Sequence, residues 1–473
     1  MPSFKIRRLN TTDSKYAKQW AELRKTITGA GFSANGKEKE LARKLFGEAM
    51  SPLHMVERIC ADVQKDGVSA VLKYTFQFDK VKMTPDAVRV PAEKLAAAHK
   101  AADSEFLDTL RNVRQNILSF QMGVLHTDAV LTVSGSHELQ LRYRPLRRVG
   151  VCLPGGAAMY PSTLLMTVVP AQAAGVSEIV VMIPPAPNGA DHNDLLAACH
   201  ELGVREVYRI GGAQAVAALA YGISGLEPVD MIVGPGNQWV SLAKRVVFGK
   251  VAVDCIGGPT ELMIVSDDFG KPEFIASDLI AQAEHGPGMA LLVTWSQTLP
   301  DAVAEALHRQ LAKLPKNAPA REILEKFGAI IRVPDANAAV ELANELAPEH
   351  LHVQTRDPEI VADRVTNAGA IFLGHFTPVA LGDYAAGPSH VLPTGASARF
   401  ASGLTANDFM RRTSVLSFTQ RGVIVIAEDV NRLAQKEGLS GHIASVTLRV
   451  IDKPTPRPPK KVNKSDTIVK ARR

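Results

Sequence analysis

The sequence predicts an α/β protein with two parallel-sheet, Rossmann-like lobes, one inserted in the other, plus a helical N-terminal arm and a small helical C-terminal domain. Short apolar stretches alternate with helical ones along most of the chain, which is typical of parallel sheets covered on both faces. The 473 residues exceed what one hydrophobic core normally serves. Gly-rich turns follow three of the predicted strands, at the edge where open parallel sheets bind ligands.

The N-terminal part of the chain is predicted to be mainly helical. Residues 1–45 are polar with helical spacing and form the arm. Residues 46–147 are assigned, with 261–400, to a first α/β domain. Amphipathic helices fill 52–120, and a short polar β region follows at 129–143.

The strand–helix alternation begins at Arg148. Residues 148–260 form the second α/β domain, which we expect to be inserted into the first. Its strands are predicted at 149–153, 178–183, 206–210 and 229–233. The first domain's strands are predicted at 262–265, 290–293, 329–331, 350–353 and 370–373. Residues 401–452 return to helices in a small C-terminal domain, although 446–450 is typical of a strand.

Composition indicates a soluble enzyme of the cytoplasm. Hydrophobic residues make up 46% of the chain and charged residues 22%. No run of eighteen apolar residues is present, so we expect no transmembrane helix and no membrane partner. Residues 1–8 lack the apolar core of a signal peptide. The four cysteines are dispersed, and we expect them to be reduced.

The positive charge is concentrated in one segment. Residues 453–473 contain eight Lys or Arg and one Asp, a net charge of +7, so the other residues sum to −1 against a total of +6. This segment is rich in Pro and Lys and is predicted to be a disordered, solubilising tail. We therefore expect no nucleic-acid partner.

Two short motifs place an imidazole beside a carboxylate. Gln282 and His285 are three residues apart on a predicted helix, so both can reach one metal ion near its C-terminus. The alternative is a polar helix end with a solvated His. Glu349 and His350 follow Pro348, whose irregular turn would let both face a cleft as a general base pair. The alternative is an N-cap with a structural His.

Asp383 and His442 are weaker candidates. An Asp in a Gly-rich turn can bind zinc but more often caps backbone. His442 lies in an amphipathic helical stretch, where an ordinary surface His is the alternative.

The Gly-rich turns favour a ligand that carries phosphate. They are Pro154-Gly155-Gly156, Gly211-Gly212-Ala213-Gln214 and Gly234-Pro235-Gly236-Asn237. Bare amides at helix starts suit a pyrophosphate, although tight strand-to-helix turns would look the same. No Gly-x-Gly-x-x-Gly is present, so the pattern itself does not establish nicotinamide binding.

Taken together, the motifs resemble the histidinol dehydrogenase family from about residue 58 to 450. The segments that carry the resemblance are Thr75-Phe76-Gln77-Phe78-Asp79, the three Gly-rich turns, Gly258-Pro259-Thr260-Glu261, Gln282-Ala283-Glu284-His285-Gly286-Pro287, Pro348-Glu349-His350-Leu351 and His390-Val391-Leu392-Pro393-Thr394. As an ordered set they are highly specific.

The resemblance implies oxidation of an amino alcohol, L-histidinol, to a carboxylate through an aldehyde, with two NAD and one zinc ion per site. Matched by motif, the zinc ligands would be Gln282, His285, Asp383 and His442. Glu349 and His350 would be catalytic, and Gln214, Asn237 and position 152 would contact NAD. Thr260 and Glu437 would contact substrate, with the zinc ligands and His350. Family members are homodimers in which the segment of Glu437 and His442 completes the partner's site.

Two departures and one alternative activity bear on these expectations. Cys152 stands where many members have a Tyr that touches NAD, and Thr260 replaces a commoner Ser but keeps the hydroxyl. Paralogues with the same zinc and NAD chemistry oxidise other small polar alcohols, including a sulfonated diol. Glu437 favours a cationic amino group, because a carboxylate would repel a sulfonate. A non-catalytic binding protein is disfavoured, since all the active-site groups are present.

Overall fold

The computed structural model describes residues 4–32, 36–155, 159–186, 189–315 and 318–451. The predicted tail at 453–473 and Gly156 of the first Gly-rich turn lie outside the described residues. The chain divides into two compact units, and each is considered by itself. Unit 1 contains residues 1–125 and 145–411, and unit 2 contains residues 126–144 and 412–473.

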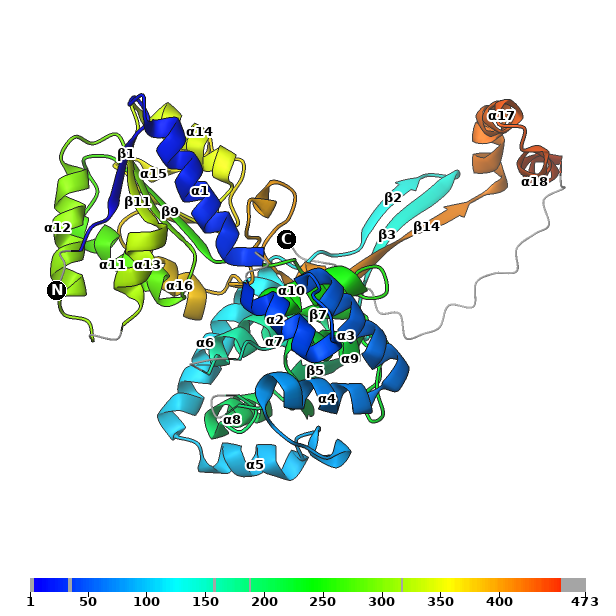
Figure 1. Cartoon of the computed structure of the whole chain (residues 1–473). Helices are drawn as coiled ribbons and strands as arrows, with labels where there is room; N and C mark the ends of the chain where they lie inside the picture. The colour runs from blue at the N-terminus through cyan, green and yellow to red at the C-terminus, as the bar shows by residue number, and fades with distance from the viewer. Residues whose placement is uncertain (1–3, 33–35, 156–158, 187–188, 316–317, 452–473) are drawn as a thin grey trace. The chain divides into compact units, whose positions relative to one another are not determined.

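Unit 1 contains a six-stranded parallel sheet in the order β1-β11-β10-β9-β12-β13. Figure 1 labels β1, β11 and β9 of this sheet. Its strands are β1 (Arg7–Asn10), β9 (Glu261–Ser266), β10 (Met289–Thr294), β11 (Gly328–Arg332), β12 (His350–Gln354) and β13 (Ala370–Leu373). Its helices are α1 (Tyr16–Phe32), α11 (Pro272–Glu284), α12 (Leu299–Leu311), α13 (Ala320–Phe327), α14 (Ala336–Leu346), α15 (Pro358–Ala362) and α16 (Val379–Tyr384). Every residue of β9, β10 and β12 is buried, so these strands are covered on both faces, although β12 alternates His and Gln with Leu and Val.

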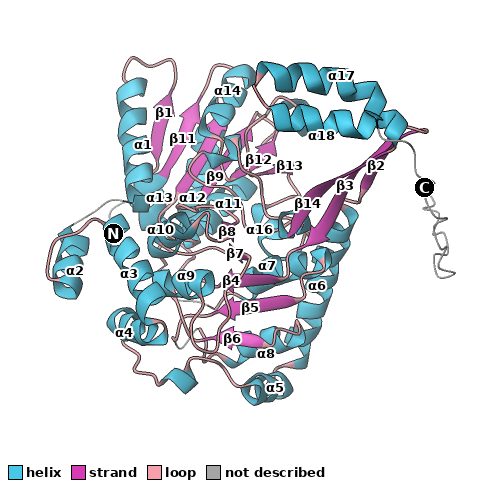
Figure 2. Cartoon of the chain, turned by 90° about the vertical axis from the view of Figure 1, so that its right-hand side faces the viewer, coloured by secondary structure: helices cyan, strands magenta, loops and turns pink. Residues whose placement is uncertain are grey.

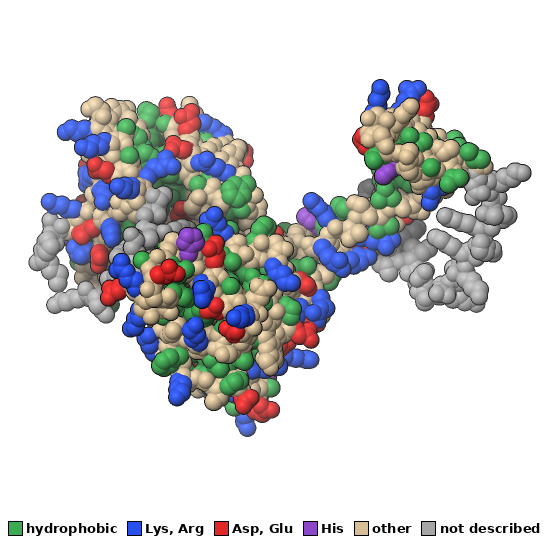
Figure 3. Space-filling model, turned by 45° about the vertical axis from the view of Figure 1, so that its right-hand side comes forward, with side chains coloured by type: hydrophobic (Ala, Val, Ile, Leu, Met, Phe, Trp, Pro, Cys, Tyr) green, Lys and Arg blue, Asp and Glu red, His purple; other side chains and the backbone are tan. Residues whose placement is uncertain are grey.

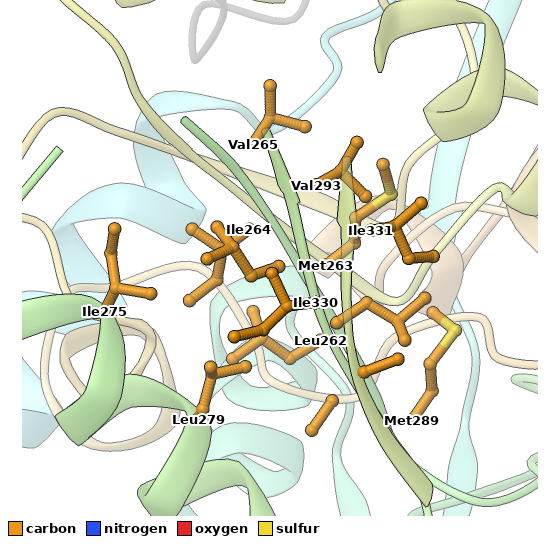
Figure 4. Packing of buried hydrophobic residues seen from close by; sticks show 14 of the residues in the cluster. Leu262, Met263, Ile264, Val265, Ile275, Leu279, Met289, Val293, Ile330 and Ile331 are labelled. Carbon is orange, nitrogen blue, oxygen red and sulfur yellow. The ribbon is translucent and has the colours of Figure 1, made fainter. Parts of the chain in front are cut away.

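The core of this lobe joins the central strands to the helix that carries two candidate ligands. Leu262 and Ile264 of β9 pack in one apolar cluster with Ile275 and Leu279 of α11 (Figure 4). This packing fixes the axis of α11 against the sheet, and therefore fixes where its C-terminal residues emerge.

Unit 1 also contains a five-stranded parallel sheet in the order β6-β5-β4-β7-β8 (Figure 2). Its strands are β4 (Arg148–Cys152), β5 (Glu178–Met182), β6 (Glu206–Tyr208), β7 (Met231–Val233) and β8 (Ala252–Val253). The connecting helices are α7 (Pro161–Ala174), α8 (Asn193–Glu201), α9 (Gly212–Tyr221) and α10 (Gln238–Val247). Alternate strand residues pack into two separate clusters, so both faces are covered: Val149 and Val151 belong to one, Cys152 and Val180 to the other.

The early helices pack on this second sheet lobe. They are α2 (Gly36–Phe46), α3 (Pro52–Asp66), α4 (Val68–Asp79), α5 (Ala92–Ala101) and α6 (Ser104–Gly123). Short 3₁₀ turns occur elsewhere in unit 1, at Pro85–Ala87, Ser397–Arg399 and Ala406–Phe409. Helices α5 and α6 pack on α8 and α7, and α3 packs on α9 and α10. The predicted grouping of residues 46–147 with 261–400 differs from these contacts. Helical periodicity predicts which face of a helix is apolar but not which sheet that face will cover.

Unit 2 is an antiparallel sheet with two helices. The sheet has the order β14-β3-β2, with β2 (Ala129–Val133), β3 (His137–Pro145) and β14 (Met410–Phe418). The helices α17 (Gln420–Lys436) and α18 (Ser440–Ile451) pack on each other. The α/β class with two parallel sheets is confirmed, but the strand predicted at 446–450 is wrong because that segment is helical. The β1, β8 and β14 strands were not predicted.

None of the helices in the described ranges is long and apolar enough to cross a membrane. On the face shown in Figure 3, Lys and Arg side chains are interspersed with Asp and Glu.

Candidate active site

A cavity of about 640 Å³ lies in unit 1 at the facing edges of its two sheets. One wall comes from segments that follow β4 and β7, including Pro235 and Asn237. The other wall comes from residues that precede or begin β9 and β12, including Thr260 and His350. The cavity therefore joins the carboxyl edge of the five-stranded sheet, where such sheets bind ligands, to the amino edge of the six-stranded sheet.

Glu349 and His350 both line this cavity, as the irregular turn predicted. Ala347 adopts a left-handed conformation with φ of 45°, which ends α14 just before Pro348. The Glu349 side chain is anchored on one oxygen, Oε2, which accepts hydrogen bonds from the Thr260 hydroxyl at 2.6 Å and from the Glu261 amide at 2.9 Å. This carboxylate is thus held at the cavity wall with acceptor capacity on its other oxygen.

His350 is oriented by the backbone. Its Nδ1 lies 3.1 Å from the carbonyl oxygen of Glu261, and a carbonyl can only accept, so Nδ1 carries the proton in the neutral ring. The lone pair is then on Nε2, which lies 3.9 Å from Asp383 Oδ1. The arrangement presents Nε2 to the cavity, beside a carboxylate on the adjacent residue.

Gln282, His285 and Asp383 come together around the same wall. His285 Nε2 lies 3.9 Å from Asp383 Oδ2, too far for a hydrogen bond. Gln282 is 5% exposed and donates from Nε2 to the Thr260 hydroxyl at 3.1 Å, which leaves its carboxamide oxygen as the acceptor atom. Thr260 therefore links a candidate metal ligand to Glu349.

These donors do not by themselves form a metal centre. Across the described ranges, no group of three or more His, Cys, Asp or Glu side chains could hold a metal ion. Two reasons account for this: Gln282 is a carboxamide, and the fourth candidate, His442, belongs to α18 of unit 2. Glu437, at the C-terminal end of α17, also belongs to unit 2. The side chains of Glu437 and His442 are both exposed in unit 2.

Two of the residues expected to contact NAD, Asn237 and Gln214, lie in surroundings that are compatible with a bound ligand. Asn237 lines the cavity and caps α10, accepting from the amides of Trp239 and Val240. Gln214, near the start of α9, is 1% exposed, and both polar atoms of its amide are buried without a hydrogen-bond partner in the described chain. An unsatisfied buried amide is costly and points to a missing ligand or water.

Cys152 does not fit the expected contact. It is the last residue of β4, is 3% exposed and does not line the cavity. Burial raises the pKa of its thiol to about 12. The small thiol packs in the apolar core of this lobe, so a contact of Cys152 with NAD stays an untested prediction.

Two further residues were not singled out by sequence reasoning. Glu261 is 8% exposed, and burial followed by the charge of Glu349 raises the pKa of its carboxyl to about 7. His390 lines the cavity, donates from Nδ1 to the Asp383 carbonyl at 2.8 Å, and has a pKa lowered by burial. Both residues lie in motifs quoted above, but their burial is a tertiary property that no local pattern signals.

Comparison with known proteins identifies the family. A family model described as histidinol dehydrogenase matches residues 47–450. The chain belongs to the histidinol dehydrogenase family. It is 49% identical over 452 residues to histidinol dehydrogenase from Rhodopirellula baltica, covering 95% of this chain and 98% of that protein.

Other relatives agree with this assignment. Histidinol dehydrogenase from Rhodopseudomonas palustris is 47% identical, covering 83% of this chain and 91% of that protein. A crystal structure of histidinol dehydrogenase from Elizabethkingia anophelis superposes with a TM-score of 0.83 at 27% identity, covering 95% of this chain and 99% of that one. The protein is therefore an oxidoreductase of this family.

Proposed function

We propose that the protein oxidises L-histidinol through L-histidinal to L-histidine, the last steps of histidine biosynthesis, with NAD and one zinc ion per site. The observation that carries the proposal is the pairing of Glu349 and His350 on one cavity wall. A two-step oxidation needs both a base for the alcohol and a group that activates water for the aldehyde, and this pair provides the two.

The zinc site would combine three donors of unit 1 with His442 of the partner subunit. His285 and Asp383 present a nitrogen and an oxygen at 3.9 Å without bonding each other, a separation that two ligands about 2 Å from one ion can span. Gln282 would add its carboxamide oxygen and His442 an imidazole. When bound, zinc would polarise the substrate oxygen and NAD would accept one hydride in each oxidation.

We assign the first proton to His350. Its Nε2 lone pair would take the hydroxyl proton as the carbon loses hydride, and the Glu261 carbonyl would hold Nδ1–H and stabilise the resulting imidazolium.

We assign the water attack to Glu349. After the first oxidation, a water proton would pass to the carboxylate while the oxygen adds to the aldehyde carbon. The bonds from Thr260 and Glu261 hold this carboxylate in place, so the oxygen not engaged by them is the one that orients water. As the water oxygen adds, the His350 imidazolium would return its proton to the aldehyde oxygen, which gives the hydrate and regenerates the base. In the second oxidation His350 would take a hydroxyl proton from this hydrate, and the protons held by His350 and Glu349 would leave to solvent with the product.

We further propose a homodimer in which unit 2 of the partner completes each site with its Glu437 and His442. Unit 2 exposes many large apolar side chains, some visible as green surface in Figure 3, which a second copy would cover. They include Val130, Leu131, Leu416, Val425, Leu433 and Leu448. The carboxylate of Glu437 would pair with the amino group of histidinol, which distinguishes this substrate from a sulfonated diol.

The two roles are separated by single-turnover kinetics on the two half-reactions. His350→Asn should impair oxidation of both histidinol and added histidinal. Glu349→Gln should slow histidinal oxidation by several orders of magnitude and affect histidinol oxidation less. Losses of equal size in both half-reactions for both variants would refute this division of roles.

A further inference from the structure

One buried ion pair lies beneath the cavity wall. Lys244, on α10, and Asp254, just after β8, have side chains that are 3% and 2% exposed. Lys244 Nζ lies 2.5 Å from Asp254 Oδ1. Burial acts to lower the pKa of Lys244, but the charge of Asp254 and its other neighbours outweigh it and the pKa is raised, so the ammonium keeps its charge.

The pair binds both backbone groups of Gly234. Lys244 Nζ donates to the Gly234 carbonyl at 2.6 Å, and Asp254 Oδ2 accepts from the Gly234 amide at 2.7 Å. Gly234 has φ of +106°, and a Cβ there would lie 2.2 Å from the carbonyl oxygen of Cys152. The residue is therefore held from both sides in a conformation that only glycine can adopt here.

The same carboxylate also fixes a second segment. Asp254 Oδ1 accepts from the Cys255 amide at 2.7 Å. Residues 235–238 follow Gly234 and residues 257–260 follow Cys255, and both stretches line the cavity. One ion pair thus sets the starting points of two cavity-lining segments, although neither charged group itself lines the cavity.

We propose that Lys244 and Asp254 are positioning residues for dinucleotide binding: they hold the Gly234–Asn237 turn in the conformation that receives NAD. The inference rests on the proposed function, because NAD is the ligand assigned to this wall. A small displacement of a binding segment is enough to reduce affinity strongly, so loss of the pair should weaken NAD binding.

The test compares three variants of the full chain: Lys244→Met, Asp254→Asn and the double variant. Calorimetric titration with NAD should show the dissociation constant rising about tenfold or more in each. Hydrogen exchange of the peptide around Gly234, measured without ligand, should be faster in each variant. The Gly234 amide loses the carboxylate in Asp254→Asn and in the double variant, and the Gly234 carbonyl loses the ammonium in Lys244→Met. The double variant leaves no buried unpaired charge, so its melting temperature should recover relative to Lys244→Met while its affinity does not.

Arg148→Met is a matched control for simple destabilisation. Arg148 is 4% exposed on its side chain and pairs with Glu178 and Glu206 at 2.8 Å, but it begins β4, at the edge of the sheet away from the cavity. The Arg148→Met variant should have a lower melting temperature than the wild type and an unchanged affinity for NAD. The inference is overturned if the double variant binds NAD as the wild type does, or if Arg148→Met weakens binding equally. Failure of the wild type itself to bind NAD would overturn the proposed function, whereas the exchange result at Gly234 would still report on the pair.

Discussion

Glu261 makes the stability of the protein depend on pH in a direction unusual for a carboxylate. Its side chain is buried beside Glu349 and accepts from the amides of Gly395 at 3.1 Å and Glu349 at 3.3 Å. Burial, followed by the negative charge of Glu349, raises the pKa from 4.5 to about 7, and the two amide hydrogen bonds offset only part of this. The folded protein therefore retains a proton that the unfolded chain releases.

The size of the effect follows from linkage. Each unit of pKa difference corresponds to about 1.4 kcal/mol, so Glu261 contributes about 3 kcal/mol of stability that is fully present below pH 4.5. This stability is lost as the pH rises through about 7, where the buried carboxyl must ionise next to Glu349. Glu261→Gln cannot ionise and loses one acceptor, a cost that is the same at every pH.

Urea denaturation from pH 5 to 8.5, with a chelator present, measures this contribution. The free energy of unfolding of the wild type minus that of Glu261→Gln should fall by about 2 to 3 kcal/mol across this range. The difference between the two proteins cancels the titration of other groups. A difference that is independent of pH, or one that grows with pH, would refute the assignment of a raised pKa to Glu261.

Three further changes have expected outcomes. Chelation should abolish activity and added zinc should restore it; full turnover in a preparation shown to be metal-free would contradict the zinc site. Deleting residues 453–473 should leave turnover and dimerisation unchanged, because such termini add few contacts, and size-exclusion chromatography with steady-state kinetics would detect any loss. Asp278→Ala removes the carboxylate of α11 that lies 3.0 Å from His352 Nδ1 and accepts a hydrogen bond from Gln354. The variant should lose about 1–3 kcal/mol of stability in thermal unfolding, and its turnover should fall because α11 is held less firmly. An unchanged melting temperature would contradict this role of Asp278.

The parallel strands were predictable because the apolar residues of each strand form a short continuous segment of the sequence. Strands such as β9 and β10 are apolar at nearly every position, which is what a strand covered on both faces requires. Edge strand β1 has no such signal: Leu9 is its one buried residue, flanked by Arg8 and Asn10, and its pairing with β11 brings together residues more than 300 positions apart. Local patterns do not contain that contact.

The helix α18 shows the opposite error. Val446, Thr447 and Val450 are β-branched, and their run favoured a strand. In the structure the segment packs on α17, where Asn431 contacts Thr447. Tertiary packing outweighed a weak local preference.

The candidate site was predictable only in part. Each motif alone allowed a structural explanation, and the ordered set of motifs was needed to indicate the chemistry. The structure brings Thr260, His285, Glu349, His350 and Asp383 to one cavity. The burial of Glu261 and of the Lys244–Asp254 pair is a tertiary property, so sequence spacing could not reveal it.

The number of NADH molecules formed per molecule of L-histidinol tests the central claim most directly. Limiting L-histidinol would be incubated with excess NAD and purified enzyme, with other small polar alcohols, including a sulfonated diol, as parallel substrates. The proposed four-electron oxidation predicts two NADH for each histidinol consumed, L-histidine as the product, and little turnover of the other alcohols. One NADH per histidinol with the aldehyde accumulating, or preferential oxidation of the sulfonated diol, would contradict it.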